Sequence, residues 1–333
     1  MDGSRGVEPR ERNARGATST LAAWAGRLER RQVPIYLAAI AVGAVLGALL
    51  PRAAGAMETA VEPSIAALLL VTFLGVPLTR FRVSVADGRF LAALLVLNFV
   101  VVPVVVWAIT RPLAASPALL IGALLVLLAP CIDYVIVFTA LAGGDRERLL
   151  AATPVLMLAQ MLALPVLVPL LGGGASGVAD LIDVGPFIRA LVLLILLPLA
   201  AAMLIQRVAP RWDLSATMVP LMVLVLVTAV GSQVPLIRTG GVQLLALVPV
   251  YAAFLVLATA AGLLLSRVAR LEVRAARALT FSGATRNSLV VLPLALAMPA
   301  QLALVPAAVV TQTVVELVGM VVLVRVLPRL LKG

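Results

Sequence analysis

The sequence predicts an all-α membrane protein: ten transmembrane helices in two inverted five-helix repeats, with helices four and nine broken and crossing. Three observations support this prediction, namely the composition, the spacing of the apolar segments and a short internal repeat. Of the 333 residues, 63% are hydrophobic, and the mean hydropathy is +1.15. Repeated apolar runs of about 20 residues, long enough to cross a bilayer, are typical of a polytopic membrane protein.

Ten apolar segments follow a polar, Arg-rich N-terminus. They divide the chain into a flexible cytoplasmic tail (1–33), a first repeat (34–172), a second repeat (184–327) and a cytoplasmic C-terminus (328–333). No segment alternates apolar and polar residues as an outer-membrane barrel strand would. A signal peptide is the alternative for the N-terminus, but its charged region would be unusually long. The segments are Pro34–Leu50, Val61–Leu78, Phe90–Thr110, Pro117–Ala142, Leu149–Leu171, Val184–Gln206, Leu214–Ser232, Val242–Ser266, Ala275–Met298 and Leu302–Leu327.

Positive charge is concentrated in alternate loops. Of the 26 Lys and Arg residues, 21 lie in the tail, in the loops on the same side as the tail, or at the C-terminus. The opposite loops hold only Arg52, Arg111 and Arg238. The positive-inside rule therefore predicts that both termini lie in the cytoplasm, and we expect the protein in the plasma membrane. Orientation and anionic lipid headgroups explain the net charge of +11 without nucleic acid as a partner.

A short internal repeat indicates inversion. Its matching elements are 156 to 159 residues apart and are separated by five segments. Because five is an odd number, the two copies must have opposite orientations, as in many secondary transporters. The first copy contains Pro51-Arg52, Pro63, Val71-Thr72 and Pro77-Leu78-x-Arg80, and the second contains Pro210-Arg211, Pro220, Val227-Thr228 and Pro235-Leu236-x-Arg238.

The fourth and ninth segments are each interrupted near the middle. Pro130–Asp133 breaks the fourth, because proline removes a backbone donor and clashes with the preceding turn. The repeat offset of about 156 leads from Cys131 to Asn287, within the polar stretch Ser282–Ser288 of the ninth. Two interrupted helices at corresponding positions predict a midplane binding site, with the helices crossing at Pro130–Asp133 and Ser282–Asn287.

Three charged residues lie deep in the predicted membrane: Asp133, Arg286 and Glu316. Each is about 14–15 Å from the cytoplasmic end of its helix at about 1.5 Å per residue. Charges at such depth are costly and should be paired inside the protein. We expect Arg286 to pair with Asp133 or Glu316, and Glu316 or Asp133 to carry the coupling proton. A purely structural ion-pair network is the alternative.

The single cysteine, Cys131, has two interpretations. It is either an inert small hydrophobe or, beside a helix break that admits solute, a soft thiolate ligand for a metalloid. Together with Asp133, Arg286 and Asn287 it makes up the predicted substrate site. With no His and one Cys, the chain offers no Cys-cluster metal site and no intramolecular disulfide, and we expect no cofactor and no enzyme.

Polar side chains also occur within other apolar segments. Gln160 lies on the fifth, Gln312 and Thr313 lie on the tenth, and Asn98 lies on the third. Hydrogen bonds between helices explain such residues about as well as contact with a solute does.

The stretch Pro130–Asp145 resembles the Cys-Ile-x-x-Val…Gly-Asp signature of the arsenite-efflux permeases in the bile acid/arsenite/riboflavin transporter superfamily. Ala284–Asn287 resembles the polar break in their ninth helix, and Val310–Glu316 resembles their tenth-helix segment that ends in Glu. The resemblance spans about Pro34–Leu327. It implies a bile acid:sodium symporter-like fold and efflux of arsenite.

Two departures from this resemblance concern coupling. Where the permeases carry a Glu after the Asn pair, this chain has Leu289. Positions resembling the sodium ligands of bile-acid-type symporters are Val135, Ile136, Ser282 and Arg286. Apolar side chains cannot replace oxygen ligands for a hard cation, and a guanidinium repels Na⁺. These departures favour protons over sodium as the coupling ion.

The sequence thus favours a proton-coupled antiporter that exports arsenite or antimonite. The alternative is a proton- or sodium-coupled carrier of organic anions, with Arg286 as the anchor. A membrane scaffold without transport activity is a third class, but it would gain nothing from two breaks at matching depth. The sequence leaves the oligomeric state open.

Overall fold

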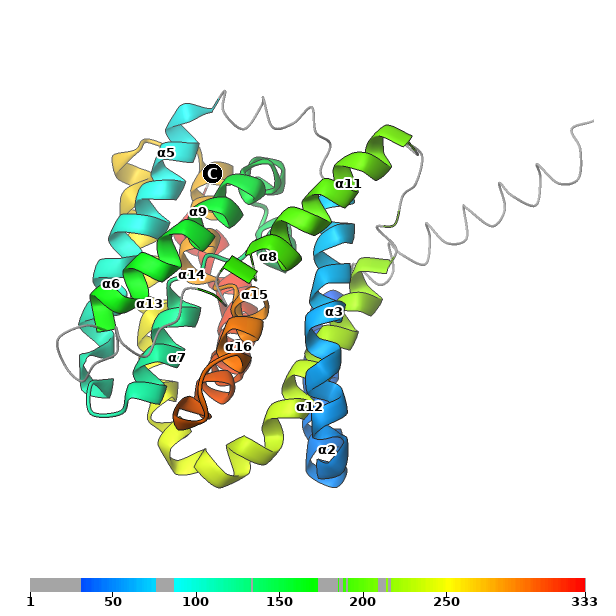
Figure 1. Cartoon of the computed structure of the whole chain (residues 1–333). Coiled ribbons are helices and arrows are strands. Elements are labelled where there is room, and N and C mark those ends of the chain that lie inside the picture. The colour runs from blue at the N-terminus through cyan, green and yellow to red at the C-terminus, as the bar shows by residue number, and fades with distance from the viewer. Residues whose placement is uncertain are drawn as a thin grey trace, which may run out of the picture.

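The computed structural model describes residues 31–75, 87–132, 134–172, 185, 188–189, 191–208, 214 and 217–332 (Figure 1). Across these residues the secondary structure is helical, apart from one bridge between Pro130 and Arg286. The α-helices are α2 (Gln32–Leu49), α3 (Ala54–Leu74), α5 (Gly88–Val96), α6 (Val102–Thr110), α7 (Pro117–Leu127), α8 (Tyr134–Leu141), α9 (Arg146–Gly172), α11 (Leu197–Val208), α12 (Met218–Leu245), α13 (Leu247–Val268), α14 (Val273–Ala284), α15 (Ser288–Leu296) and α16 (Val305–Leu330). Two π-helical turns, η2 (Leu97–Val101) and η5 (Leu191–Leu196), precede α6 and α11.

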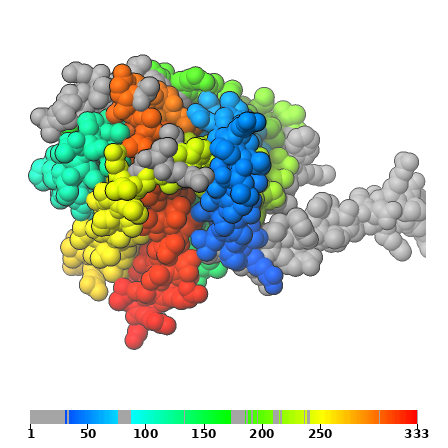
Figure 2. All heavy atoms as spheres, turned by 90° about the horizontal axis from the view of Figure 1, so that it is seen from below, coloured from blue at the N-terminus to red at the C-terminus, as the bar shows by residue number. Residues whose placement is uncertain are grey.

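The helices form two groups that stand side by side (Figure 1). In the smaller group α12 packs along α2 and α3, and α11 packs on α3. The larger group consists of α5 to α9 and α13 to α16. Helix α16 contacts helices of both groups, and from below it lies between α13 and α2 (Figure 2). The two groups therefore meet along α16.

Close contact between α2 and α12 depends on glycine. A Cβ atom added at Gly47 would lie 2.3 Å from the carbonyl oxygen of Gly231, and one at Gly43 would lie 2.8 Å from that of Val227. Small residues allow two helix backbones to approach without side chains between them, a common solution within membranes.

The predicted apolar segments correspond to single helices or to interrupted ones, and the protein is an all-helical, multi-pass membrane protein. By length and composition, six helices of the described chain are sufficient to cross a membrane. Three shorter apolar helices lie at Pro34–Leu49, Pro117–Leu127 and Val192–Val208. The count of ten crossings and the inverted-repeat organisation remain predictions.

The region after the seventh segment differs from the prediction. We expected a loop around Arg238, but α12 continues as a helix to Leu245. It descends beside α2 and α3 and then turns along the lower end of the molecule (Figure 1). Pro235 lies inside this helix. A proline inside a helix often kinks it without ending it.

Candidate functional site at the crossing of two broken helices

Both predicted breaks are present, and they pair with each other. The fourth helix is interrupted between α7 and α8, and the ninth between α14 and α15. The backbone N–H of Cys131 donates to the carbonyl oxygen of Thr285 (3.2 Å), and that of Asn287 donates to the carbonyl oxygen of Ala129 (2.7 Å). Backbone groups released from the two helices are thereby satisfied within the protein, as an apolar surrounding requires.

The pairing is symmetric in the sequence. Pro130 and Arg286, the two residues of the bridge, are 156 positions apart, an offset that also occurs in the sequence repeat. Moving along the chain by that offset turns Cys131 into Asn287 and Ala129 into Thr285, so the two hydrogen bonds exchange places. Every antiparallel bridge has this exchange; the specific observation is that the offset of the bridge equals one of the offsets of the sequence repeat.

The ninth break is shorter than predicted. Helix α14 continues to Ala284, so only 285–287 are non-helical, and Ser282 lies inside the helix. The hydroxyl of Ser282 binds another helix instead, because its Oγ accepts a hydrogen bond from Asn98 Nδ2 (3.2 Å). Asn98 lies in the π-helical turn η2, and such turns are frequent at functional sites.

Arg286 is completely buried, and its guanidinium is held by the protein itself. It lies over the ring of Phe254, 5.2 Å from the ring centroid. The carbonyl oxygens that it binds belong to the C-terminal ends of α14 and α7, where carbonyls lack intrahelical partners and the helix dipole is negative. Nη2 contacts Asn98 Oδ1 (2.9 Å) and the carbonyl oxygens of Ser282 (2.7 Å) and Gly283 (2.6 Å), and Nη1 contacts that of Leu127 (3.3 Å).

Of the two partners expected for Arg286, Asp133 and Glu316, the second does not form an ion pair with it. Glu316 Oε2 accepts instead from the backbone N–H of Arg286 (2.8 Å), and no described carboxylate forms an ion pair with the guanidinium. The reason is geometric: the side chain of Arg286 folds back onto the C-terminal end of α14, whereas its backbone N–H faces Glu316 of α16. Pairing of Arg286 with Asp133 remains a prediction, because Asp133 lies outside the described residues.

Glu316 is buried and receives three hydrogen bonds. Oε1 accepts from the hydroxyl of Tyr134 (2.7 Å), and Oε2 accepts from Gln312 Nε2 and from the backbone N–H of Arg286. The hydroxyl of Tyr134 is also 3.1 Å from the carbonyl oxygen of Arg286. A phenol has one hydrogen, so Tyr134 donates to only one of these two acceptors at a time.

The remaining predicted site residues lie in the two breaks. Asn287 is the N-cap of α15, and its Oδ1 accepts from the backbone N–H of Val290 (3.2 Å). The side chain of Cys131 lies in the fourth break and is 1% exposed. Leu289, found where the resemblance implies a Glu, is buried among apolar residues.

Sequence reasoning missed two residues of this site, Tyr134 and Phe254. Tyr134 carried a usable signal, because it is a hydroxyl-bearing residue directly after a helix break. Phe254 carried none, since an aromatic residue in an apolar segment is ordinary packing surface.

Several buried polar atoms of the described residues lack a hydrogen-bond partner. They include Arg286 Nε, Asn287 Nδ2, Gln312 Oε1 and both amide atoms of Gln160. Each unsatisfied group costs about 1–3 kcal/mol when buried in protein. The interior therefore retains hydrogen-bonding capacity that a solute or water can use. Within the described ranges, no group of three or more His, Cys, Asp or Glu residues is arranged to hold a metal ion.

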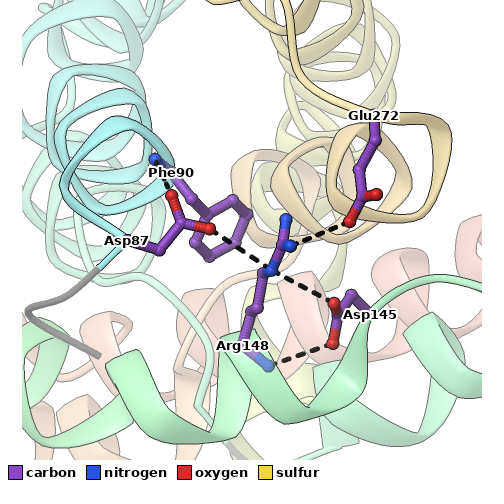
Figure 3. A network of polar contacts seen from close by, with 5 residues as sticks. All are labelled: Asp87, Phe90, Asp145, Arg148 and Glu272. Carbon is purple, nitrogen blue, oxygen red and sulfur yellow. Dashed lines mark hydrogen bonds and ion pairs between the residues drawn. The ribbon is translucent and has the colours of Figure 1, made fainter. Parts of the chain in front are cut away.

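A second polar network lies at the ends of the helices (Figure 3). Arg148 pairs with Asp87 (3.3 Å), Asp145 (3.2 Å) and Glu272 (2.9 Å), which precede α5, α9 and α14. Asp87 also caps α5 by accepting from the N–H of Phe90 (3.2 Å). The pairs are partly exposed, so each contributes little alone. The network lies about 18 Å along α14 from the ninth break, at about 1.5 Å per residue, and we assign it to holding three helix ends together.

The comparison with protein families agrees with this architecture. Residues 62–246 match the model of the Sodium Bile acid symporter family. This match covers more than half of the chain and includes the fourth helix with its break. No curated protein matches the chain.

Proposed function

The chain belongs to the sodium bile acid symporter family, and on this premise we propose that it transports a small solute through the crossing of its two broken helices. Proteins of this family are transporters and not enzymes. We also propose that it resides in the plasma membrane, with both termini in the cytoplasm; the distribution of its Lys and Arg residues supports this orientation.

We propose protons as the coupling ion, and the placement of Arg286 is the observation that carries this proposal. Its guanidinium occupies the position between the C-terminal ends of α7 and α14, surrounded by four oxygen acceptors. Oxygen atoms in such an arrangement suit a hard cation. A cation that is covalently part of the chain cannot leave with the solute, so sodium cannot couple transport at this position.

Glu316 is the proposed proton carrier. When it is ionised, Tyr134 donates to it. When it is protonated, its own O–H can donate to Tyr134, and Tyr134 then donates to the carbonyl oxygen of Arg286. Each protonation state thus gives the ninth break a different set of hydrogen bonds. Such a two-state element is what coupling between a proton and a solute requires.

The proposed substrate is arsenite or antimonite, exported in exchange for protons. These solutes are neutral hydroxides at neutral pH, and their soft trivalent centres prefer sulfur ligands. Cys131 supplies a thiol inside the break, beside the N–H groups of the crossing. In binding, the sulfur would replace one hydroxyl of the solute, and that hydroxyl and the thiol proton would leave as water. Release would be the reverse hydrolysis, in which a water returns its hydroxyl to the metalloid and its proton to the sulfur.

An organic anion carrier is the second candidate. The family match and the unpartnered Nε of Arg286 favour it, because that N–H can still meet an anion. Both Nη1 and Nη2 already donate to protein oxygens, which makes Arg286 a weak anchor for a carboxylate. Asn287 Nδ2 could supply a second donor.

Transport in everted membrane vesicles tests these proposals. We expect arsenite uptake to follow an imposed pH gradient, to be indifferent to exchange of Na⁺ for K⁺, and to be lost in Cys131→Ser, which keeps nearly the same volume. Ser64→Ala is the matched control, because Ser64 bonds only a carbonyl of its own helix. Arsenite uptake by Cys131→Ser at the parental rate would refute the metalloid mechanism. Sodium-dependent taurocholate uptake by the parent would instead establish the anion carrier.

A further inference from the structure

Gln160 is a buried amide that the protein leaves without partners. It lies near the middle of α9, a helix of 27 residues, and its side chain is fully buried. Neither Nε2 nor Oε1 has a hydrogen-bond partner among the described residues. Helix α9 packs against α7, α8 and α14, three of the four half-helices that meet at the crossing. A buried polar side chain without partners requires an explanation, such as a bound solute or water.

The offset of the bridge identifies the counterpart of Gln160. The offset of 156 that relates Pro130 to Arg286 takes Gln160 to Glu316. Both residues lie near the middle of long helices, α9 and α16, in the two halves of the chain. Glu316 faces the ninth break, and by the same offset Gln160 would face the fourth break, in keeping with the packing of α9 against α7 and α8.

Each donor to Glu316 has a counterpart that cannot donate. The three donors are the backbone N–H of Arg286, the hydroxyl of Tyr134 and the amide of Gln312. Their counterparts by the same offset are Pro130, Val290 and Leu156. Proline has no backbone N–H, and valine and leucine have no polar side-chain atom. Gln160 is therefore a polar side chain like Glu316, but none of the three positions that correspond to the donors of Glu316 can donate a hydrogen bond to it.

We propose that Gln160 binds the transported solute, as the first-half partner of the site around Cys131 and Asn287. An amide offers one acceptor and two donors, and the three counterpart residues are uncharged and apolar. This combination suits a small neutral solute with hydroxyl groups and disfavours an anion, whose charge would be uncompensated there. The inference deepens the proposed function and rests on it for the identity of the solute.

Replacing Gln160 by Leu separates binding from folding. The two side chains have similar volume, and the change removes no protein hydrogen bond. We therefore expect the unfolding temperature of solute-free Gln160→Leu to equal or exceed that of the parent. We expect the KM for arsenite uptake in vesicles to rise about tenfold, which corresponds to about 1.4 kcal/mol. Gln160→Met provides a second apolar substitution of similar volume if Gln160→Leu does not insert.

The control is Thr72→Val, which also removes a buried polar group without changing volume. Thr72 bonds a carbonyl oxygen of its own helix, Leu68 (2.9 Å), and lies on α3, outside the crossing. This variant should lose some thermal stability and keep the parental KM. The opposite pattern in the two variants would distinguish a solute contact from general damage to packing.

Binding measurements separate this inference from the proposed function. Purified parent and Gln160→Leu are heated with arsenite, antimonite, boric acid or taurocholate, and the shift in unfolding temperature is recorded. Stabilisation of the parent by a neutral hydroxide, reduced in Gln160→Leu, supports the inference even if transport proves not to be proton-driven. Equal shifts in both proteins, or shifts with taurocholate alone, overturn it even if arsenite export is established. An unchanged KM with lower stability would assign the amide to a structural water and also overturn it.

Discussion

Replacing Arg286 by Gln should destabilise the protein and create a sodium-dependent stability that the parent lacks. The substitution removes the guanidinium but leaves its four oxygen acceptors in place, three backbone carbonyls and Asn98 Oδ1. The contact with the ring of Phe254 is also lost. The shorter, neutral amide of Gln cannot reach all of these groups, so several buried acceptors become unsatisfied.

The magnitude follows from these contacts. Hydrogen bonds to a charged group contribute about 1.5–3 kcal/mol each, and a desolvated cation–π contact about 2 kcal/mol. These values do not add, because burying the guanidinium itself is costly. Removing one member of a buried charged arrangement typically costs about 3–5 kcal/mol. At an unfolding entropy of about 2.1 cal/mol/K per residue, that loss would lower the unfolding temperature of this 333-residue chain by about 4–7 °C.

Sodium should restore part of the loss. Four oxygen atoms around a position between two negative helix ends suit a hard cation once the fixed charge is gone. At a sodium concentration 100 times the dissociation constant, the recovered free energy is about 2.7 kcal/mol. Thermal unfolding in detergent, followed by fluorescence in NaCl, KCl or choline chloride at equal ionic strength, measures both effects.

Arg111 provides the matched control. Its guanidinium also lies over an aromatic ring, that of Trp107, and donates to the carbonyl oxygen of Leu171 (2.6 Å), but the residue is only partly buried. Arg111→Gln should cost about 1 kcal/mol or less and show no response to sodium. Parental stability in Arg286→Gln, or equal stability of that variant in NaCl and choline chloride, would refute the assignment of Arg286 to a cation position.

Three further predictions concern single side chains. Glu316→Gln should retain arsenite exchange between equal concentrations but lose uptake driven by a pH gradient; pH-driven uptake at the parental rate would exclude Glu316 as the proton carrier. Tyr134→Phe should change the pH profile of transport, whereas Tyr251→Phe, which loses a bond to a carbonyl of α16 (3.0 Å), should lower stability by about 1 kcal/mol and leave the profile unchanged. Arg270 follows α13 with φ of 49°, a left-handed conformation that glycine adopts without strain, so Arg270→Gly should raise the free energy of unfolding by about 1 kcal/mol, and a lower unfolding temperature would contradict this.

The sequence by itself determined the helical membrane class and the positions of both helix breaks. These features follow from local chemistry: long apolar runs require a bilayer, and a proline or a polar cluster within such a run interrupts the helix. The offset of the repeat also predicted the position of the ninth break from that of the fourth. It also indicated that Arg286 and Glu316 lie at similar depth.

Only the tertiary structure decided which groups satisfy the buried charges. Depth along a helix is fixed by sequence, but the direction of a long side chain depends on packing and on the acceptors within reach. The guanidinium of Arg286 turns back to the carbonyl oxygens of two helix ends. Glu316 therefore accepts hydrogen bonds from the backbone N–H of Arg286 and from the hydroxyl of Tyr134, and does not pair with the guanidinium. The π-helical turn that contains Asn98 is likewise a tertiary feature, because the apolar sequence around Asn98 gives no signal for a π-helical turn. The sequence therefore determined which polar residues lie deep in the membrane. The crossing of the two broken helices determined which groups these residues bind.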